Sequence, residues 1–544
     1  MTPHAHTIIE GPIWCGLHEP PAEALAIHGT RIIAVGKRAA VRALAGPGTT
    51  RIDLDGRVAI PAFNDAHQHL LPLGLGMKHA NLRPEKVRTL DALLETIRQA
   101  AAKTPKGQWV LARGYDHNEL DVRRHPTLDE LTAAAPDHPV LARRTCGHMA
   151  VANQAALTLT EIGHNTPDPE GGVIERRQGR LTGLFQERAM RLLYDHVPEP
   201  SDTELVDAIE RAGTHMNELG FTSVMDANVG MAAGMREIAA YRTALETNRL
   251  PVRTWITLAG NPEGIATQAW DAGIRPNHSL GGEDDMLRFG AMKVFADGSA
   301  GGLTAAMHDP YLETAGGGTG VFCFPETTMH SLLAKYHAQG WQLAIHAIGD
   351  AAIEQVLSGI EAADTPANPV AGRRHRIEHC GFLTQSQMAR MAARGIEPVP
   401  QPIFMYEFGD LYITNLGEPR AAAAYPMRTW LESGLHPAAS SDAPVSSTDP
   451  FQNLYTMITR RTNKGTQIGP EQAITLEQAV HCLTWCGAYT QFAEHRRGAL
   501  RPGMLADIAI LSQNIFKTGP RTLRDTKADQ VLRAGTTIFN RHAT

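Results

Sequence analysis

The sequence predicts an α/β fold: a (β/α)8 barrel of the TIM type, with an inserted subdomain after strand one and a small β-sandwich domain formed by both termini. Three observations predict this fold. Short apolar segments alternate with helical stretches through the middle of the chain, as in repeated βα units. Short β-rich segments stand at both ends of the chain. Finally, about 140 residues follow the first barrel strand before the helix that leads into the second, too many for a simple crossover.

The two ends of the chain predict the small β domain. Glycines separate short runs of β-forming residues there, which is the pattern of strands joined by turns. We expect strands at 7–9, 24–27, 31–35, 51–58, 506–511 and 528–536. The predicted composite domain therefore comprises residues 1–57 plus 496–544.

The barrel is predicted to span residues 58–495. Helical runs such as 202–219 and 325–338 fall between apolar segments of strand length. The eight strands are expected at 58–63, 222–226, 252–258, 287–295, 342–347, 375–379, 396–400 and 437–441. In a barrel of this type the catalytic groups lie at the C-terminal ends of the strands.

The long connection after strand one predicts an inserted subdomain at residues 74–200, near the mouth of the active site. A stretch of this length without structure of its own is uncommon in a compact protein. Its strand candidates are 109–112, 140–144, 172–175 and 181–185.

Composition restricts the class of protein. The chain has 544 residues, of which 43% are hydrophobic and 20% charged, the balance of a soluble globular protein. Lys and Arg total 51 against 57 Asp and Glu, so the slight acidic excess argues against a nucleic-acid partner. No apolar run suits a membrane span or a signal peptide, and we expect a cytoplasmic protein without a membrane partner. Barrels of this size commonly form homodimers, although the sequence does not reveal the oligomeric state.

Side chains that suit a metal site fall at the ends of five predicted strands. His67 and His69 alternate on an extended backbone, so both imidazoles point to one side and can bind one ion. Lys293 lies among apolar residues, where a charged ammonium group is costly. The full set comprises His67, His69, Lys293, His346, His379 and Asp442.

Each of these residues alone has an ordinary structural explanation. A histidine on an apolar strand is more often a hydrogen-bonded core residue than a ligand, and the chain has 25 histidines. Asp442 could form a turn, and Lys293 could pair with an acid. The coincidence of six suitable side chains at matching strand ends favours a metal centre. A serine-hydrolase site at Ser299 is disfavoured because the first glycine of Gly-x-Ser-x-Gly is missing.

Several longer motifs make the sequence similar to the amidohydrolase superfamily, and within it to amidohydrolase family 3, the YtcJ-like group that includes N-substituted formamide deformylase. The resemblance covers nearly the whole chain. Its motifs begin at Trp109 (WVLARGYDHN), Gly147 (GHMAVAN), Lys293 (KVFADGS), His346 (HAIGD) and Gly498 (GALRPGMLADIA).

The resemblance implies a two-metal hydrolase. His67, His69 and Asp442 would bind one ion, His346 and His379 the other, and Lys293 would bridge them as a CO2-derived carbamate. Imidazole and carboxylate ligands suit zinc, with manganese, iron, cobalt or nickel as alternatives. A hydroxide bridging the metals would attack the substrate carbonyl carbon, a C–N bond of the amide type would break, and Asp442 would pass the proton to the leaving amine.

The substrate is less well defined. The expected small molecule is an amide, with N-substituted formamides as the chemistry of the similar group. Candidate pocket residues, for which ordinary packing is an equal alternative, are Tyr115, Asp116, His148, Phe404 and Tyr406. Two other functions stay open: a mononuclear deaminase of an amino-heterocycle, which Lys293 disfavours, and an inactive barrel scaffold, which the complete ligand set disfavours.

Overall fold

The computed structural model describes residues 4–84, 86–145, 147, 149–169, 171–281 and 285–542. The chain divides into two compact units. One unit comprises Met1–Leu73 and Ile209–Thr544, and the other Gly74–Ala208. None of the helices in the described ranges is both long and apolar enough to cross a membrane.

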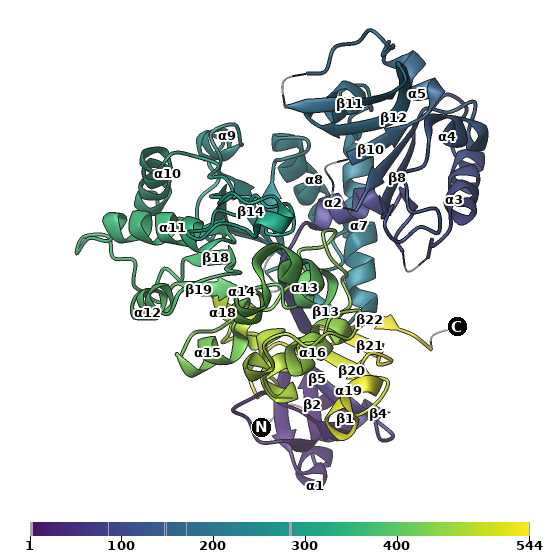
Figure 1. Ribbon diagram of the computed structural model, residues 1–544. Coiled ribbons are helices and arrows are strands. Elements are labelled where there is room, and N and C mark those ends of the chain that lie inside the picture. The colour runs from purple at the N-terminus through teal and green to yellow at the C-terminus, as the bar shows by residue number, and fades with distance from the viewer. Residues whose placement is uncertain are drawn as a thin grey trace. The chain divides into compact units, whose positions relative to one another are not determined.

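Strands from both termini share one sheet in the first unit. Antiparallel pairing of β5 with β20 joins the N-terminal strands to the C-terminal ones, seen as purple beside yellow in Figure 1. The order is β22-β21-β20-β5-β1-β2-β3, with β4 paired to β1. The strands are β1 (Ala5–Ile13), β2 (Ala22–His28), β3 (Arg31–Gly36), β4 (Ala45–Asp53), β5 (Val58–Pro61), β20 (Ile508–Leu511), β21 (Ala528–Arg533) and β22 (Thr536–Asn540).

Both faces of this sheet carry buried apolar side chains. Leu25 and Ile27 belong to one hydrophobic cluster, whereas Ala24 and Ala26 belong to another. Alternate residues of a strand point to opposite faces, so the sheet is covered on both sides.

Seven parallel strands form a nearly closed barrel in the same unit. Their order is β6-β13-β14-β16-β17-β18-β19, and the short β15 (Ser279–Leu280) adds an antiparallel pair to β16. They are β6 (Phe63–Gln68), β13 (Phe221–Val229), β14 (Arg253–Ala259), β16 (Leu287–Phe295), β17 (Gln342–Ala347), β18 (Arg376–His379) and β19 (Glu397–Val399). Almost every residue in them is buried, as expected where helices cover a parallel sheet.

Residues 437–442 occupy the eighth position without forming a regular strand, contrary to the prediction for 437–441. Ser440 N donates to Pro400 O at 3.1 Å on the β19 side, and Asp442 N donates to His67 O at 2.7 Å on the β6 side. Few ladder bonds form here, so the segment joins the first and last strands of the barrel without a continuous pairing pattern.

The prediction of a single barrel strand at 58–63 was wrong in its limits. The apolar run is divided between two sheets, with β5 in the terminal sheet and β6 in the barrel. Between them, Ala62 N donates to Asp507 O at 3.0 Å. A continuous apolar run does not reveal where a chain leaves one sheet for another.

Helices follow the barrel strands and complete the repeated βα units. Short sequence signals set their ends: Thr384 forms a capping box with Gln387 at the start of α12, and Gly395 ends that helix at a φ of +63°. The longer helices are α7 (Asp202–Glu218), α8 (Met235–Glu246), α10 (Glu326–Ala338), α11 (Asp350–Ala363), α12 (Gln385–Arg394), α13 (Ile403–Leu416) and α16 (Pro450–Thr459).

The second unit, residues 74–208, has a sheet and a core of its own. The sheet order is β11-β12-β10-β9-β8-β7, and Leu93 and Ile97 of α3 (Leu90–Lys103) pack in its larger hydrophobic cluster. Its strands are β7 (Ala80–Asn81), β8 (Val110–Tyr115), β9 (Val140–Arg144), β10 (Met149–Ala152), β11 (Gly172–Arg177) and β12 (Arg180–Glu187). The four-residue β10 was not predicted, because so short a run has no distinctive period.

Candidate metal centre

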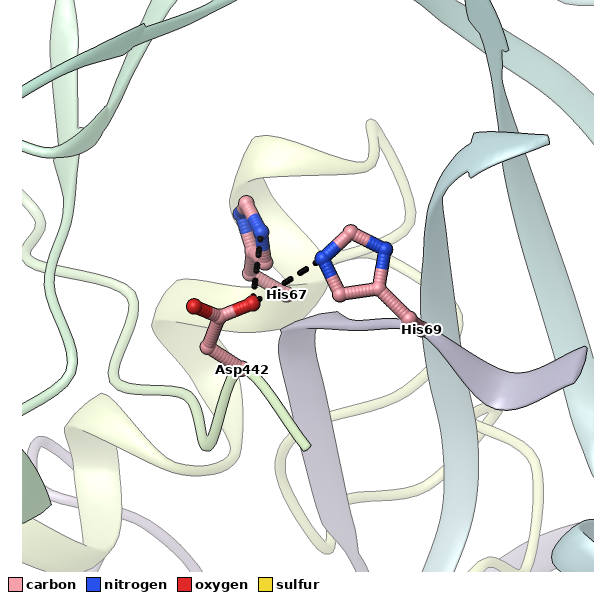
Figure 2. Close-up of side chains that lie close together, drawn as sticks. All are labelled: His67, His69 and Asp442. Atoms are coloured by element: carbon pink, nitrogen blue, oxygen red, sulfur yellow. Dashed lines mark ion pairs between the residues drawn. The ribbon is translucent and has the colours of Figure 1, made fainter. Parts of the chain in front are cut away.

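Two histidines and an aspartate converge where β6 meets the closing segment 437–442. Asp442 Oδ1 lies 3.0 Å from His69 Nε2 and 3.4 Å from His67 Nε2; dashed lines mark these two pairs in Figure 2. One potential ligand atom from each residue lies within 4.8 Å of the others. His67 Nε2 and Asp442 Oδ1 are buried without a hydrogen-bond partner. Buried polar atoms rarely stay unpaired, so these two atoms fit a bound cation.

The opposite ring nitrogens of this pair are held by the protein. His67 Nδ1 donates to the Glu378 carboxylate, and His69 Nδ1 donates to the backbone carbonyl of Ala227 at 2.7 Å. These bonds place the ring proton on Nδ1 of each histidine. The lone pair on each Nε2 points away from Glu378 and Ala227 and can bind a ligand. Metal-binding histidines are commonly oriented in this way by an acceptor behind the ring.

A second pair of histidines adjoins the first. The ring centroid of His379, at the end of β18, lies 5.0 Å from that of His67 and 4.3 Å from that of His346 on β17. Gln401 Oε1 lies 2.6 Å from His379 Nδ1, and Gly298 O lies 2.9 Å from His346 Nε2. Each ring therefore keeps one nitrogen available for a ligand.

Burial keeps this second pair neutral. Loss of solvation, followed by the charge of Lys293, lowers the pKa of His346 to about 3. Burial and the neighbouring His346 hold the pKa of His379 well below its usual value. Neutral imidazole is the form that binds metal ions.

Lys293 of β16 lies in the same interior. It is 1% exposed, and its Nζ lies 4.9 Å from the ring centroid of Phe295. Burial lowers the pKa of Lys293 to about 8, partly offset by the charges of Glu378 and Asp442. At pH 7 about a tenth of a lysine with this pKa is the neutral, nucleophilic amine, far more than for an exposed lysine.

Asp442 stays ionised although it is buried. Burial raises its pKa, but the contacts with His67 and His69 outweigh that effect and hold the pKa well below the usual value. Asp442 and His379 have φ angles of +55° and +65°. Such backbone conformations are uncommon outside glycine and cluster at functional sites.

Three carboxylates that the sequence analysis did not single out support the ligands. Asp65 of β6 accepts hydrogen bonds from Ser441 N at 3.1 Å and Ser441 Oγ at 2.6 Å, which ties the closing segment to β6. Glu378 lies between His67 and the Arg376 guanidinium, whose Nε is 2.5 Å away. In the sequence, Glu378 was marked only by its position next to His379.

Asp297 is the third supporting carboxylate. It accepts hydrogen bonds from the backbone N–H groups of Ala306, Ile348 and Gly349 at 2.9–3.0 Å. One of its oxygens lies 3.4 Å from His346 Nε2. Asp297 thus connects the loop after β16 to the end of β17 and helps to position His346.

The candidate pocket residues separate into different surroundings. Phe404 of α13 is stacked nearly parallel to His379, with centroids 6.2 Å apart and an angle of 12°. Tyr406 instead contacts the ring of Tyr455, and its hydroxyl accepts a hydrogen bond from Arg524 at 3.0 Å. Only Phe404 of these two therefore contacts a candidate ligand.

The remaining pocket candidates belong to the second unit. Tyr115 is fully buried and its hydroxyl lies 2.8 Å from His125 Nδ1. Asp116 accepts a hydrogen bond from Arg144 Nη2 at 2.8 Å. These contacts fit the alternative expectation for both residues, ordinary packing within the inserted subdomain instead of a role in a substrate pocket. His148 lies outside the described residues.

The chain resembles known proteins along nearly its whole length. The model of the amidohydrolase family matches residues 50–539. The putative amidohydrolase YtcJ of Bacillus subtilis is 30% identical over 491 residues, covering 88% of each chain. N-substituted formamide deformylase of Arthrobacter pascens is 29% identical over 527 residues, covering 94% of this chain and 95% of the relative.

A solved structure shares the fold. The metal-dependent hydrolase of Pyrococcus horikoshii superposes with a TM-score of 0.77 at 24% identity, covering 95% of this chain and 99% of that one. The match of the family model over residues 50–539 shows that the chain belongs to the amidohydrolase family.

Proposed function

We propose that this hydrolase cleaves a C–N bond of the amide type, other than a peptide bond, in a small molecule. N-substituted formamides are the first class to test, because a relative of nearly equal length is a formamide deformylase. The observation that carries the proposal is that His67, His69 and Asp442 converge. Two of their own buried atoms, His67 Nε2 and Asp442 Oδ1, lack hydrogen bonds.

We further propose two metal positions. His67, His69 and Asp442 would hold one ion, and His346 and His379 the other. Zinc suits imidazole and carboxylate ligands best. The two histidine pairs, with the buried Lys293 near enough for its charge to act on both His69 and His346, favour two ions over the single ion of a mononuclear deaminase.

Lys293 would carry a carbamate. Its neutral Nζ would form a bond to the carbon of CO2 and lose one proton, which converts a cation into an anion with two oxygen ligands. The buried position and the lowered pKa of Lys293 support this step, since both favour the neutral amine. An anion there would also remove the repulsion between a lysine ammonium and two cations.

When bound, the ions supply Lewis acidity and a hydroxide nucleophile at neutral pH. Asp442 would accept a proton on its carboxylate and transfer that proton to the nitrogen of the leaving amine. Its low pKa keeps the carboxylate ionised and ready to accept. Glu378 and Gln401 would hold the imidazoles of His67 and His379 in fixed orientations throughout.

Metal content and a substrate panel test this function. We expect two metal ions per chain by elemental analysis and release of amine from N-formyl or N-acyl compounds. The panel should also contain carbamates, cyclic amides and amino-heterocycles. One ion per chain with ammonia release from amino-heterocycles alone would establish the deaminase instead, and purified protein without transition metal would contradict the proposal.

A further inference from the structure

Two arginines lie directly opposite each other in the sheet of the second unit. Arg113 of β8 pairs with Arg143 of β9 in the parallel register of the two strands. Like charges in this position destabilise a sheet unless another charge compensates them. The pair therefore needs an explanation beyond the packing of two strands.

Both arginines belong to the face of the sheet on which a short helix packs. Leu141 of β9 lies in one hydrophobic cluster with Leu193 of α6 (Arg191–Tyr194). Since alternate residues of a strand share a face, Arg143 points to the same side of the sheet as Leu141. Arg113, its partner in register, lies on that side too.

A cavity opens beside Arg143 on this face. Its volume is about 310 Å³, at the lower end of the range for sites that bind small molecules. Met190 and Tyr194 give it apolar surface, and Glu187 is the only carboxylate among the described residues that line it. The described lining consists of Arg143, Gly147, Glu187, Met190, Arg191 and Tyr194.

The guanidinium group of Arg113 is half-buried, and within the described ranges it forms no hydrogen bond and no ion pair. The backbone of Gly76 lies against it, because a Cβ atom placed on Gly76 would be 2.7 Å from Arg113 Nη1. Burial, and then the charges of Arg83 and Arg143, lower the pKa of Arg113 to about 10. Arg113 is therefore still charged at neutral pH, and no carboxylate compensates it.

The charge of Arg143 also lacks a carboxylate partner in the described part of the chain. Its Nε and Nη2 donate to the backbone carbonyl of Gly147 at 3.1 and 3.0 Å. The two arginines also act on His79, where, after burial, they lower the pKa to about 4. Positive charge that is partly buried and uncompensated favours a bound anion.

We propose that this cavity binds a small organic anion, with the carboxylate of the ligand against Arg143 and its apolar part against Met190 and Tyr194. Guanidinium groups bind carboxylates through charge-assisted hydrogen bonds, often two at once. The neighbouring charge of Arg113 would strengthen the binding. The site lies within the inserted subdomain, and it does not depend on the proposed amide cleavage.

Benzoate is a suitable probe, because it joins a carboxylate to an aromatic ring. Calorimetry should show saturable binding to the wild type and about 10-fold weaker binding to Arg143→Gln, since a hydrogen bond between charged groups is lost. Inorganic phosphate, which has no apolar part, should bind more weakly than benzoate. The proposal is overturned if benzoate does not bind the wild type, if it binds Arg143→Gln equally well, or if phosphate binds as tightly.

The same titration with Lys293→Ala separates this site from the candidate metal centre, because carboxylates also bind metal ions. We expect benzoate to bind Lys293→Ala although that variant should lose metal. Benzoate binding that disappears in Lys293→Ala and is unchanged in Arg143→Gln would assign the ligand to the metal centre and refute the cavity site. Failure of the proposed amide cleavage would leave benzoate binding at the cavity unaffected.

Arg113→Gln and Glu187→Gln test the charge of the site even if Arg143→Gln folds poorly. Arg113→Gln should weaken benzoate binding about threefold, and its unfolding midpoint in denaturant should stay the same or rise, because two opposed charges are relieved. Glu187→Gln should tighten the binding, because it removes a negative charge from the lining. Loss of stability in Arg113→Gln with unchanged benzoate affinity would show that the arginine pair is structural and overturn the proposal.

Arg98→Gln is the matched control. Arg98 is an exposed arginine on α3 of the same unit, and it pairs with Glu95 at 2.8 Å. We expect this variant to bind benzoate as the wild type does. An equal loss of affinity in Arg98→Gln and Arg143→Gln would attribute the effect to net charge and refute a specific site.

Discussion

The two ends of β18 carry buried histidines with opposite properties. His375, just before the strand, accepts a bond from Leu343 N at 3.0 Å through Nδ1, while its Nε2 lies 2.9 Å from Nδ1 of His337. The remaining His337 nitrogen bonds to Asn368 O at 3.0 Å. Every ring nitrogen of this pair has a hydrogen-bond partner in the protein. We call such a pair closed, because no ring nitrogen is left to bind a ligand.

The histidines at the C-terminal strand ends are not closed in this way. The protein holds one nitrogen of His67 through Glu378, and the other is buried without a hydrogen bond. The same residue type is therefore fully hydrogen-bonded by the protein at one end of the barrel and leaves a ring nitrogen unpaired at the other. The decisive difference is whether the protein itself satisfies both ring nitrogens.

Lys293→Ala should have the largest effect at the ligand end. We expect activity to fall at least about 1000-fold, because a ligand contributes more than the roughly 10–100-fold of a residue behind it, and metal content should fall with it. Added short carboxylates should restore part of both by replacing the anionic bridge. Full activity of the variant, measured with the best substrate of the panel, would disprove the carbamate.

Replacing His379 and His375 separately tests the comparison itself. His379→Ala should lose bound metal and activity while the protein remains folded. His375→Ala should keep its metal but lower the free energy of unfolding by about 1–3 kcal/mol, since Leu343 N and His337 lose their partner. Elemental analysis and denaturant unfolding of both variants measure the two effects. Loss of metal in His375→Ala at full stability would break the distinction between the two ends.

Glu378→Gln should have a smaller effect on metal binding. The amide can still accept from His67, but it lacks the charge that holds the imidazole proton on Nδ1, so we expect metal affinity to weaken about 10–100-fold. Competition with a chelator measures the affinity. The half-buried carboxylate of Glu354 pairs with Arg390 at 2.7 Å, away from the candidate metal centre. It offers a control, because Glu354→Gln should leave the affinity unchanged.

The smallest expected effect is a pH dependence of stability from the closed pair. Burial, and then His337, hold the pKa of folded His375 well below the usual 6.5. Below pH 6.5 the unfolded chain therefore binds a proton that the folded chain does not, and stability falls as pH decreases. His375→Asn should reduce this slope by up to about 1.4 kcal/mol per pH unit between pH 6.5 and 5. Unfolding titrations at several pH values measure it, and identical slopes would contradict the prediction.

Much of the barrel could be predicted because its signals are local. The strands at 287–295 and 342–347 have the predicted limits, since a buried parallel strand is a continuous apolar run bounded by turn residues. The change of sheet at Ala62 could not be predicted, because it depends on pairing with Asp507 far away in the sequence. The irregular segment 437–442 was mistaken for a strand for the same reason.

In the candidate site, too, some features follow from local sequence signals and others from contacts between distant residues. The positions of His67 and Lys293 on barrel strands, and of Asp442 in the segment that closes the barrel, follow from the order of apolar runs along the chain, and this order is a property of the sequence. Only the tertiary structure decided which ring nitrogen each histidine keeps free, because it set which acceptor lies behind each ring. Those contacts join residues from separate elements, such as His67 and Glu378, which are 311 residues apart in the sequence, and no local pattern encodes them.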